Sequence, residues 1–316
     1  MAPPIAPQVV IAPPAAKAPR HSLLRVGHDL LTFDGDKTEI NQSEVNNRWE
    51  AGVEFLPEGC DSGGLWVPCE GQSFEPGTNP DSVVYIPMLA WAPWTCSSFG
   101  SEAIDFKGRA TRKLDSVASH WLEREFWDGA NAQAFALPNL YLAGPTVTIL
   151  NPFATSTPLV YAFGLLEQAI SECLPGGEGT IHMSRMVATL LESAHLIHHI
   201  PDEQNKDTIR FFSQFGHEII VGSGYDGSAP TSLGGGVDPT GDTQWIYATS
   251  PVGVKEGKVQ MTPEKESEAL DRKTNTITYV ANRTVAATWD GCCHFGINVN
   301  LCSTCCVSPL IVPSGA

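Results

Sequence analysis

Five cysteines near the end of this sequence are the side chains best suited to bind a metal ion. Cys302 and Cys305 are separated by two residues, a spacing that suits two thiolates on one tetrahedral zinc ion. A second pair with this spacing is missing, because Cys292 and Cys293 are adjacent, and residues 295–301 are typical of a strand. We therefore expect no metal, and favour packed thiols or exposed thiols that cross-link neighbouring subunits.

Gly222, Gly224 and Gly227 match the glycine spacing of a dinucleotide-binding turn, and a predicted strand precedes them. Such a turn also needs a helix directly after it, because the helix N-terminus binds the pyrophosphate. Residues 228–241 are too rich in Gly, Pro, Ser and Thr to form that helix. We predict a plain turn and no cofactor.

His195, His198 and His199 follow a predicted helix, and the first and third have the spacing of two metal ligands on one helix. No Glu directly follows His195, as it does in the H-E-x-x-H motif, and Pro201 begins a loop. We therefore predict exposed histidines. The sequence lacks G-x-S-x-G and P-loop lysine motifs, and no pair of neighbouring carboxylates suggests catalysis, so we predict no catalytic residue and no enzyme.

Composition narrows the possible partners. The chain has 316 residues and a formal net charge of -16, which argues against dominant contact with phosphate backbones. No apolar run is long enough to span a membrane, so a membrane is not expected as a partner. The nine cysteines are an odd number. Because we see no secretory signal, we expect a reducing compartment and free thiols buried as small apolar side chains.

The element that dominates the predicted organisation is one long amphipathic helix over residues 101–129. Ser101 is its expected N-cap and Gly129 its expected stop. Four cations, Arg109, Arg112, Lys113 and Arg124, lie mostly off its apolar stripe, which predicts a solvated charged face. The expected stripe consists of apolar residues near helical spacing: Ala103, Phe106, Ala110, Leu114, Val117, Trp121 and Phe126.

Around this helix the sequence predicts an α+β protein. Residues 48–95 alternate like strands with long turns, and two strands that protrude alone need a partner surface. A second helix is predicted with Pro158 as its first residue and with Val160 on its apolar stripe. A third helix is predicted with Ser184 as its N-cap, and it includes Met186. We expect a short helical turn at 23–26, an extended segment at 138–150, a polar helix at 262–271, and strands at 179–183, 208–212, 218–221, 245–249, 276–288 and 295–301.

With these elements in order, the sequence resembles the HK97-fold major capsid proteins of tailed bacteriophages, and within them those of phages of actinobacteria. The resemblance covers residues 45–301 and rests on the order of elements and on four segments. It implies an N-terminal arm (1–45), an extended β loop (46–95), a peripheral domain with the spine helix (96–150 and 250–290), and an axial domain with the C-terminal tail (151–249 and 291–316). The four segments are RKLDSVASHWLEREFWDG, GEGTIHMSRMVATLLESAHL, EIIVGSGYDGSAP and the long stretch WIYATSPVG to GINVNL.

The resemblance implies a structural shell subunit that self-assembles into an icosahedral head and encloses double-stranded DNA. Its implied partners are copies of itself in hexamers and pentamers, a separate scaffolding protein, a portal, a decoration protein, and DNA bound without sequence specificity. Its implied location is the virion capsid, after assembly in the host cytoplasm. Two alternatives stay open: an encapsulin-like compartment shell, and a zinc-binding soluble enzyme that uses the Cys-rich C-terminus. We see no basis for choosing a Lys–Asn cross-link and predict none.

Large apolar side chains of the predicted β excursion are the candidate contacts between subunits, because buried aromatic residues anchor interfaces. The alternative is that they pack inside one compact domain. The candidate contact residues are Trp49, Phe55, Leu65, Trp66, Val67, Tyr85, Trp91 and Trp94.

Overall fold

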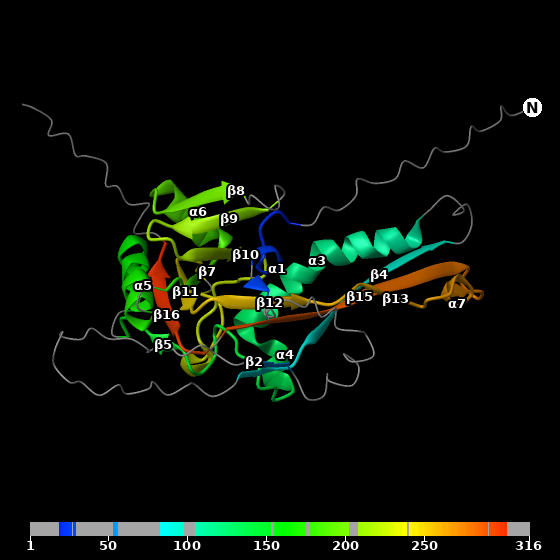
Figure 1. Ribbon diagram of the computed structural model, residues 1–316, viewed down its shortest axis with the longest axis horizontal. Helices are drawn as coiled ribbons and strands as arrows, with labels where there is room; N and C mark the ends of the chain where they lie inside the picture. The colour runs from blue at the N-terminus through cyan, green and yellow to red at the C-terminus, as the bar shows by residue number, and fades with distance from the viewer. Residues whose placement is uncertain are drawn as a thin grey trace, which may run out of the picture.

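The molecule is elongated, with a wide end built on one large sheet and a narrow end built on a long strand and a long helix (Figure 1). It is an α+β fold, as the sequence predicts. The computed structural model describes residues 19–26, 28–29, 53–55, 83–97, 105–152, 155–174, 177–201, 208–238, 240–289 and 291–301.

Helix α3 (Phe106–Asp128) connects the two ends. It begins after Asp105, whose Oδ1 accepts a hydrogen bond from Gly108 N at 2.8 Å. The N-cap is therefore Asp105, one turn later than the predicted Ser101, which lies outside the described residues. The helix ends at Gly129 in the left-handed conformation, with φ of 63°, as predicted, because glycine adopts this conformation without a Cβ clash.

The buried side of α3 follows the predicted stripe at Phe106, Leu114 and Phe126 but not at Trp121, which is 56% exposed. Buried residues recur every four positions, and each step of four turns the helix by about 40° beyond a full circle. The buried side therefore rotates along the helix, and Leu122 faces the core in place of Trp121.

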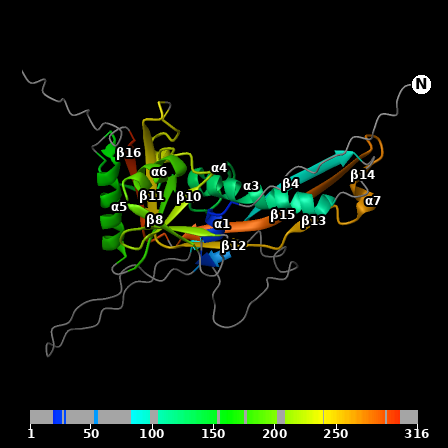
Figure 2. The ribbon, with the colours of Figure 1, turned by 90° about the horizontal axis from the view of Figure 1, so that it is seen from above.

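The narrow end is a six-stranded sheet around one long strand, β15 (Thr276–Trp289). Strand β4 (Met88–Ser97) pairs antiparallel with β15 along one edge, and α3 packs on one face of this pair. Figure 2 shows β15 continuing toward the wide end. Along its other edge β15 pairs with β12 (Val252–Glu256), β13 (Gln260–Thr262) and β14 (Leu270–Asp271), and β12 pairs with β1 (His28–Asp29).

The wide end is an eight-stranded sheet in the order β5-β16-β11-β7-β10-β9-β8, with β6 also paired to β16. The pair β2 (Val53–Phe55) and β3 (Val83–Tyr85) forms a separate small sheet. The strands of the large sheet are β5 (Thr148–Ile149), β6 (Thr157–Pro158), β7 (Thr180–Ser184), β8 (Ile197–Pro201), β9 (Ile209–Ser213), β10 (Glu218–Gly222), β11 (Thr243–Thr249) and β16 (His294–Asn300).

Both faces of the large sheet are covered. Because successive side chains of a strand point to opposite faces, Ile181 and Met183 of β7 pack under α5 (Leu159–Cys173) and α6 (Arg185–Ser193). Side chains on the other face of the sheet, such as Ile220 of β10 and Tyr247 of β11, pack under the last turns of α3 and under α1 (Leu23–Val26). Three short elements complete the described fold: α4 (Ala130–Ala134), η1 (Thr231–Leu233) and α7 (Glu266–Ala269).

Several local predictions need correction. Helix α5 begins one residue after Pro158, and Val160 of its predicted stripe is 49% exposed, as Met186 of α6 is 58% exposed. The helix predicted at 262–271 is a single turn, α7, because its residues also form strands β13 and β14. Residues 138–150 are turns and irregular backbone apart from strand β5. By contrast, Ser184 caps α6 as predicted, accepting from Val187 N.

Within the described part of the chain, no helix combines the length and the apolar character that a membrane span requires.

Candidate functional site

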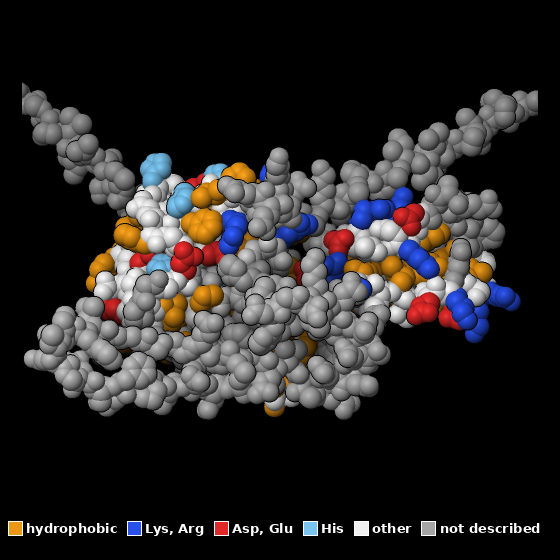
Figure 3. Space-filling model, in the orientation of Figure 1, with side chains coloured by type: hydrophobic (Ala, Val, Ile, Leu, Met, Phe, Trp, Pro, Cys, Tyr) orange, Lys and Arg blue, Asp and Glu red, His pale blue; other side chains and the backbone are white. Residues whose placement is uncertain are grey.

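Strand β4 has one face on its own chain and one face in solvent. Its even-numbered residues, such as Ala92 and Trp94, pack against α3. On the opposite face Leu89 is 59% exposed and Trp91 is 58% exposed. Leu89, Trp91, Pro93 and Thr95 form what we call the outer face of β4. Figure 3 shows hydrophobic side chains lying exposed along the narrow end.

The outer face continues onto the neighbouring strand. Val280 of β15 pairs with Pro93, and the hydroxyls of Thr95 and Thr278 lie 3.0 Å apart. Beyond β4 the sheet has no further strand within the described residues, so β4 is an edge strand ten residues long. Long edge strands with exposed apolar side chains are sites where other chains bind.

The structure places the predicted contact residues differently. Trp91 is exposed, as a contact residue must be. Trp94 is partly buried on α3, with the Arg109 guanidinium 5.3 Å from its ring centroid. Phe55 lies in β2, opposite Val83. The remaining candidates outside the described residues are Trp49, Leu65, Trp66 and Val67.

Tyr85 corrects the prediction, because it is only 2% exposed and belongs to the core of its own chain. Burial raises the pKa of its hydroxyl, and the nearby Glu125 carboxylate adds to this effect. A Tyr at the end of a short strand gives no sequence signal for this burial. Of the predicted contact residues with described side chains, Trp91 on the outer face of β4 is the one that lies exposed.

The described part of the predicted arm also packs on its own chain. Leu23 is fully buried and Val26 is 4% exposed. Arg20 O accepts a hydrogen bond from Ile209 N of β9 at 3.0 Å, and the β1 strand adds to β12. Residues 19–26 and 28–29 therefore pack on the wide end, α3 and the narrow end of the same subunit, and the arm predicted over 1–45 lies mostly outside the described residues.

His21 fixes this segment to the large sheet. Its Nδ1–H donates to Ile209 O at 2.7 Å, and its Nε2 accepts from Val221 N at 2.9 Å. Burial lowers the pKa of His21, partly offset by the bond to Ile209 O and the nearby Glu218 carboxylate. The neutral ring thus serves as a bridge between β9 and β10.

The turn at 222–227 wraps around the carboxylate of Glu123 on α3. Glu123 Oε2 accepts from Ser223 N at 2.6 Å, Ser223 Oγ at 2.9 Å and Gly224 N at 3.0 Å. Its Oε1 accepts from Leu23 N at 3.0 Å. Only glycine fits at 224, because a Cβ there would lie 2.3 Å from a backbone oxygen of α3. Two N–H groups of the glycine motif, those of Ser223 and Gly224, are therefore already bonded to a carboxylate of this chain.

The three histidines at 195–199 are exposed, as predicted, but His198 and His199 lie in strand β8 rather than in a loop. His199 Nδ1 lies 3.4 Å from Glu192 Oε1 on the surface. Among the described residues, no three His, Cys, Asp or Glu side chains come together in a way that would hold a metal ion.

The cysteines differ from the expectation of free thiols. Cys173, at the end of α5, and Cys293, just before β16, form a disulfide with Cα atoms 6.1 Å apart. Cys292 is also disulfide-bonded. Packing of α5 on β16 brings together residues 120 positions apart, which no local pattern reveals. Cys302 and Cys305 lie outside the described residues.

Two buried histidines at the junction of sheet and helix were not predicted. His182 Nε2–H donates to Thr249 Oγ1 at 3.1 Å, and His294 Nε2–H donates to Leu142 O at 2.8 Å. Burial lowers the pKa of His182 to about 3, with a contribution from His294, and lowers that of His294 to about 4. Both rings are therefore neutral at pH 7 and act as core residues.

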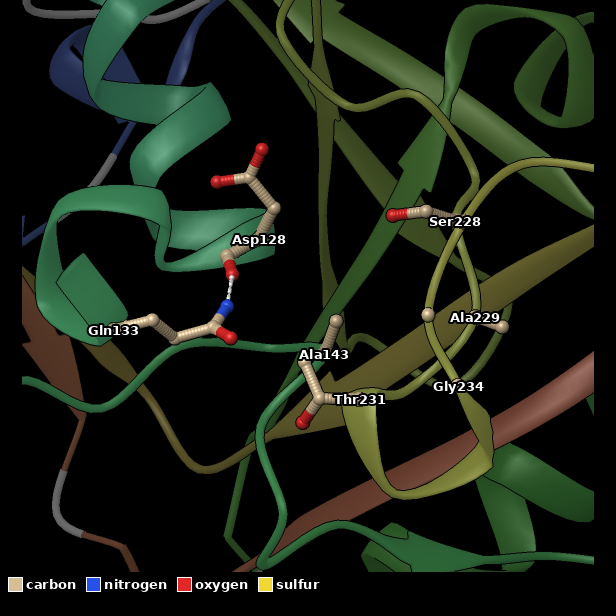
Figure 4. Close-up of a pocket in the computed structure, with 9 residues that line it drawn as sticks. Asp128, Gln133, Ala143, Ser228, Ala229, Thr231 and Gly234 are labelled. Atoms are coloured by element: carbon tan, nitrogen blue, oxygen red, sulfur yellow. Dashed lines mark hydrogen bonds between the residues drawn. The ribbon is translucent and has the colours of Figure 1, made fainter.

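A hollow of about 350 Å³ lies between the end of α3 and the loop around η1, and Figure 4 shows the residues that line it. Gln133 Nε2 donates to Asp128 O at 2.7 Å at its mouth. Burial raises the pKa of the Asp128 carboxyl. The lining offers this carboxyl, the hydroxyls of Thr231 and Ser228, and glycine backbone. The Ser228 hydroxyl accepts a hydrogen bond from Trp127 Nε1 at 2.8 Å, and among the described lining residues no hydroxyl contacts a base.

Comparison with solved structures identifies the architecture. The capsid of a native GTA particle is similar with a TM-score of 0.52 and 10% identity, over 94% of this chain and 95% of that chain. The chain has the HK97-like capsid fold. Gordonia phage Cozz (TM-score 0.48, 9% identity, 92% and 90% covered) and the SrpI encapsulin complex from Synechococcus elongatus (0.41, 9%, 71% and 76%) are more distantly similar. No family model and no curated protein sequence matches the chain.

Proposed function

We propose that this chain is the structural shell subunit of a tailed-phage head, which self-assembles into an icosahedral shell around double-stranded DNA. The capsid fold supports this proposal, and the observation that carries it is the outer face of β4. An exposed Trp and Leu on an edge strand cost free energy in a monomer, since each fully buried large apolar side chain is worth about 1.5–3 kcal/mol. Contact with another copy removes that cost.

The proposal extends to the partners and the parts of the subunit. The narrow end serves as the peripheral domain and the wide end as the axial domain, arranged in hexamers and pentamers. A separate scaffolding protein, a portal and a decoration protein complete the particle, which assembles in the host cytoplasm and becomes the virion capsid. No catalytic role is proposed, because the capsid fold and the side chains described above support a structural one.

The test uses the full chain, expressed alone and with a candidate scaffolding protein, and electron microscopy of negatively stained samples. We expect closed particles of uniform size. The Trp91→Ala variant should form at least tenfold fewer particles while its urea unfolding midpoint stays at the wild-type value. Trp121→Ala is the matched control, because Trp121 is equally exposed but lies on α3, and it should assemble normally.

Two results would contradict the proposal. One is a wild-type chain that stays monomeric at high concentration with and without the scaffold. The other is a Trp91→Ala variant that assembles as well as Trp121→Ala, which would remove the outer face of β4 from the contacts. Particles that enclose an enzyme and no nucleic acid would favour the encapsulin alternative.

A further inference from the structure

The first two turns of α3 carry a concentration of positive charge. Lys107, Arg109, Arg112 and Lys113 lie within seven residues of a chain with a net charge of -16. We call these four side chains the basic face of α3. Figure 3 shows Lys and Arg side chains over this helix, with acidic side chains beside them.

Two of these cations are held by groups that carry no negative charge. Lys113 Nζ donates to Pro93 O at 2.9 Å. The guanidinium of Arg109 lies over the Trp94 ring, 5.3 Å from its centroid. A carbonyl oxygen and an indole ring orient a cation without neutralising it. The charges of Arg109 and Lys113 therefore remain available to an anion.

The same holds for the other two cations. Lys107 Nζ donates to Glu264 O at 3.0 Å and lies over the Tyr279 ring at 5.4 Å. Arg112 is exposed, and among the described residues no group pairs with it. None of the four cations forms an ion pair with a described carboxylate, which is unusual in a protein with 35 Asp and Glu residues.

The carboxylates nearest in sequence are bound elsewhere. Asp105 Oδ1 accepts from Gly108 N as the N-cap of α3. Asp115 pairs with Arg283 of β15, whose other nitrogen donates to Glu256 Oε2 at 2.5 Å. Arg283 thus holds the Asp115 carboxylate, which lies one turn from Arg112. Asp105 keeps its charge as the N-cap of α3, so the basic face carries four cations that no described carboxylate pairs with.

We infer that the basic face of α3 binds the phosphate backbone of duplex nucleic acid. This inference rests on the proposed function, which places double-stranded DNA inside the shell. Contacts to phosphates need only oriented cations, and the release of condensed counterions supplies the free energy. The acidic remainder of the subunit limits the contact to this face. Because four charges per subunit bind weakly, the shell holds the duplex by many weak contacts and without sequence preference.

The experiment measures how the affinity of the unassembled full chain for a fluorescent duplex depends on salt, by anisotropy from about 50 to about 200 mM. Four phosphate contacts predict a slope of log K against log salt of about -3.6, at about -0.9 per contact. Arg112→Gln combined with Lys113→Gln should reduce the slope by about 1.8, and Arg112→Gln alone by about 0.9, since Arg112 has no partner to lose.

The matched control is Arg272→Gln with Lys273→Gln, which removes the same charge from exposed residues between β14 and β15. It should leave the slope unchanged. The inference is overturned if both double variants change the slope equally, or if neither changes it. It is also overturned if unlabelled polyglutamate at equal charge displaces the fluorescent duplex better than unlabelled duplex does, because the partner is then an acidic protein or peptide. Particle formation by each variant, scored by electron microscopy, tests the proposed function separately.

Discussion

The Glu123→Gln substitution tests how the described part of the arm is held on its own subunit. Glu123 is fully buried and accepts four hydrogen bonds, three on Oε2 and one on Oε1. Gln has one acceptor oxygen. Because Ser223 and Gly224 supply the three donors to Oε2, the amide oxygen should stay there, and the NH₂ group then faces Leu23 N. The bond to α1 is lost while the bonds to the turn are kept.

The size of the effect follows from this arrangement. A buried N–H without a partner costs about 1–3 kcal/mol, and the bonds that remain at Oε2 lose the strength that a charged acceptor gives. We expect Glu123→Gln to lower the free energy of unfolding by about 2–4 kcal/mol, a large part of the roughly 5–15 kcal/mol of a typical domain. Glu268→Gln removes the same charge from an exposed site and should change stability by less than about 0.5 kcal/mol.

Two measurements on unassembled subunits check this reasoning. Urea unfolding gives the change in stability of each variant. Trypsin digestion reports on the segment itself, because Arg20 and Arg25 are exposed and flank the buried Leu23. In Glu123→Gln, cleavage after Arg25 should become at least tenfold faster than in Glu268→Gln. Equal stability and equal cleavage in the two variants would refute the role that we give to Glu123.

Two further predictions concern the wide end. The pKa values of His182 (about 3) and His294 (about 4) lie below the unfolded value of 6.5, so the unfolded chain binds more protons below pH 6.5. The contribution of these two histidines to the free energy of unfolding should therefore be constant above pH 6.5. Below that pH it should fall by about 1.4 kcal/mol per histidine and pH unit, down to about pH 4. A urea midpoint that does not change between pH 7 and 5 would contradict this. Cys173→Ser removes the bond to Cys293, so it should lower the free energy of unfolding by about 4 kcal/mol and reduce the destabilisation that a reductant causes. Cys96→Ser changes a free cysteine and should have neither effect. Equal responses of the two variants would show that the bond does not form in solution.

Features set by neighbouring residues were predictable from the sequence. Gly129 ends α3 and Ser184 begins α6 because a left-handed glycine and a capping hydroxyl act within one helical turn. The long strand β15 was predicted at 276–288 and spans Thr276–Trp289, because alternating β-branched residues favour a strand in most contexts. The order of these elements was enough to identify the fold class.

Features set by distant residues were not predictable. Trp121, Val160 and Met186 are apolar and near helical spacing, yet each is about half exposed, because the direction of a helix face depends on where the sheet lies. Tyr85 was expected at a contact and is buried for the same reason. The outer face of β4 contains only one predicted contact residue, Trp91, since alternation in a strand shows which residues share a face but not which face α3 covers.

The glycine motif at 222–227 shows how the fold decides what a sequence pattern means. Glycines at this spacing allow backbone N–H groups to converge on one anion, whichever anion is present. In a dinucleotide site that anion is a phosphate of a ligand. Here α3 places the carboxylate of Glu123 against Ser223 N and Gly224 N, and Gly224 is required because the helix backbone comes so close. The donors that would select a cofactor instead join the turn, the helix and α1 into one body, so the same chemistry that binds ligands elsewhere stabilises a subunit here.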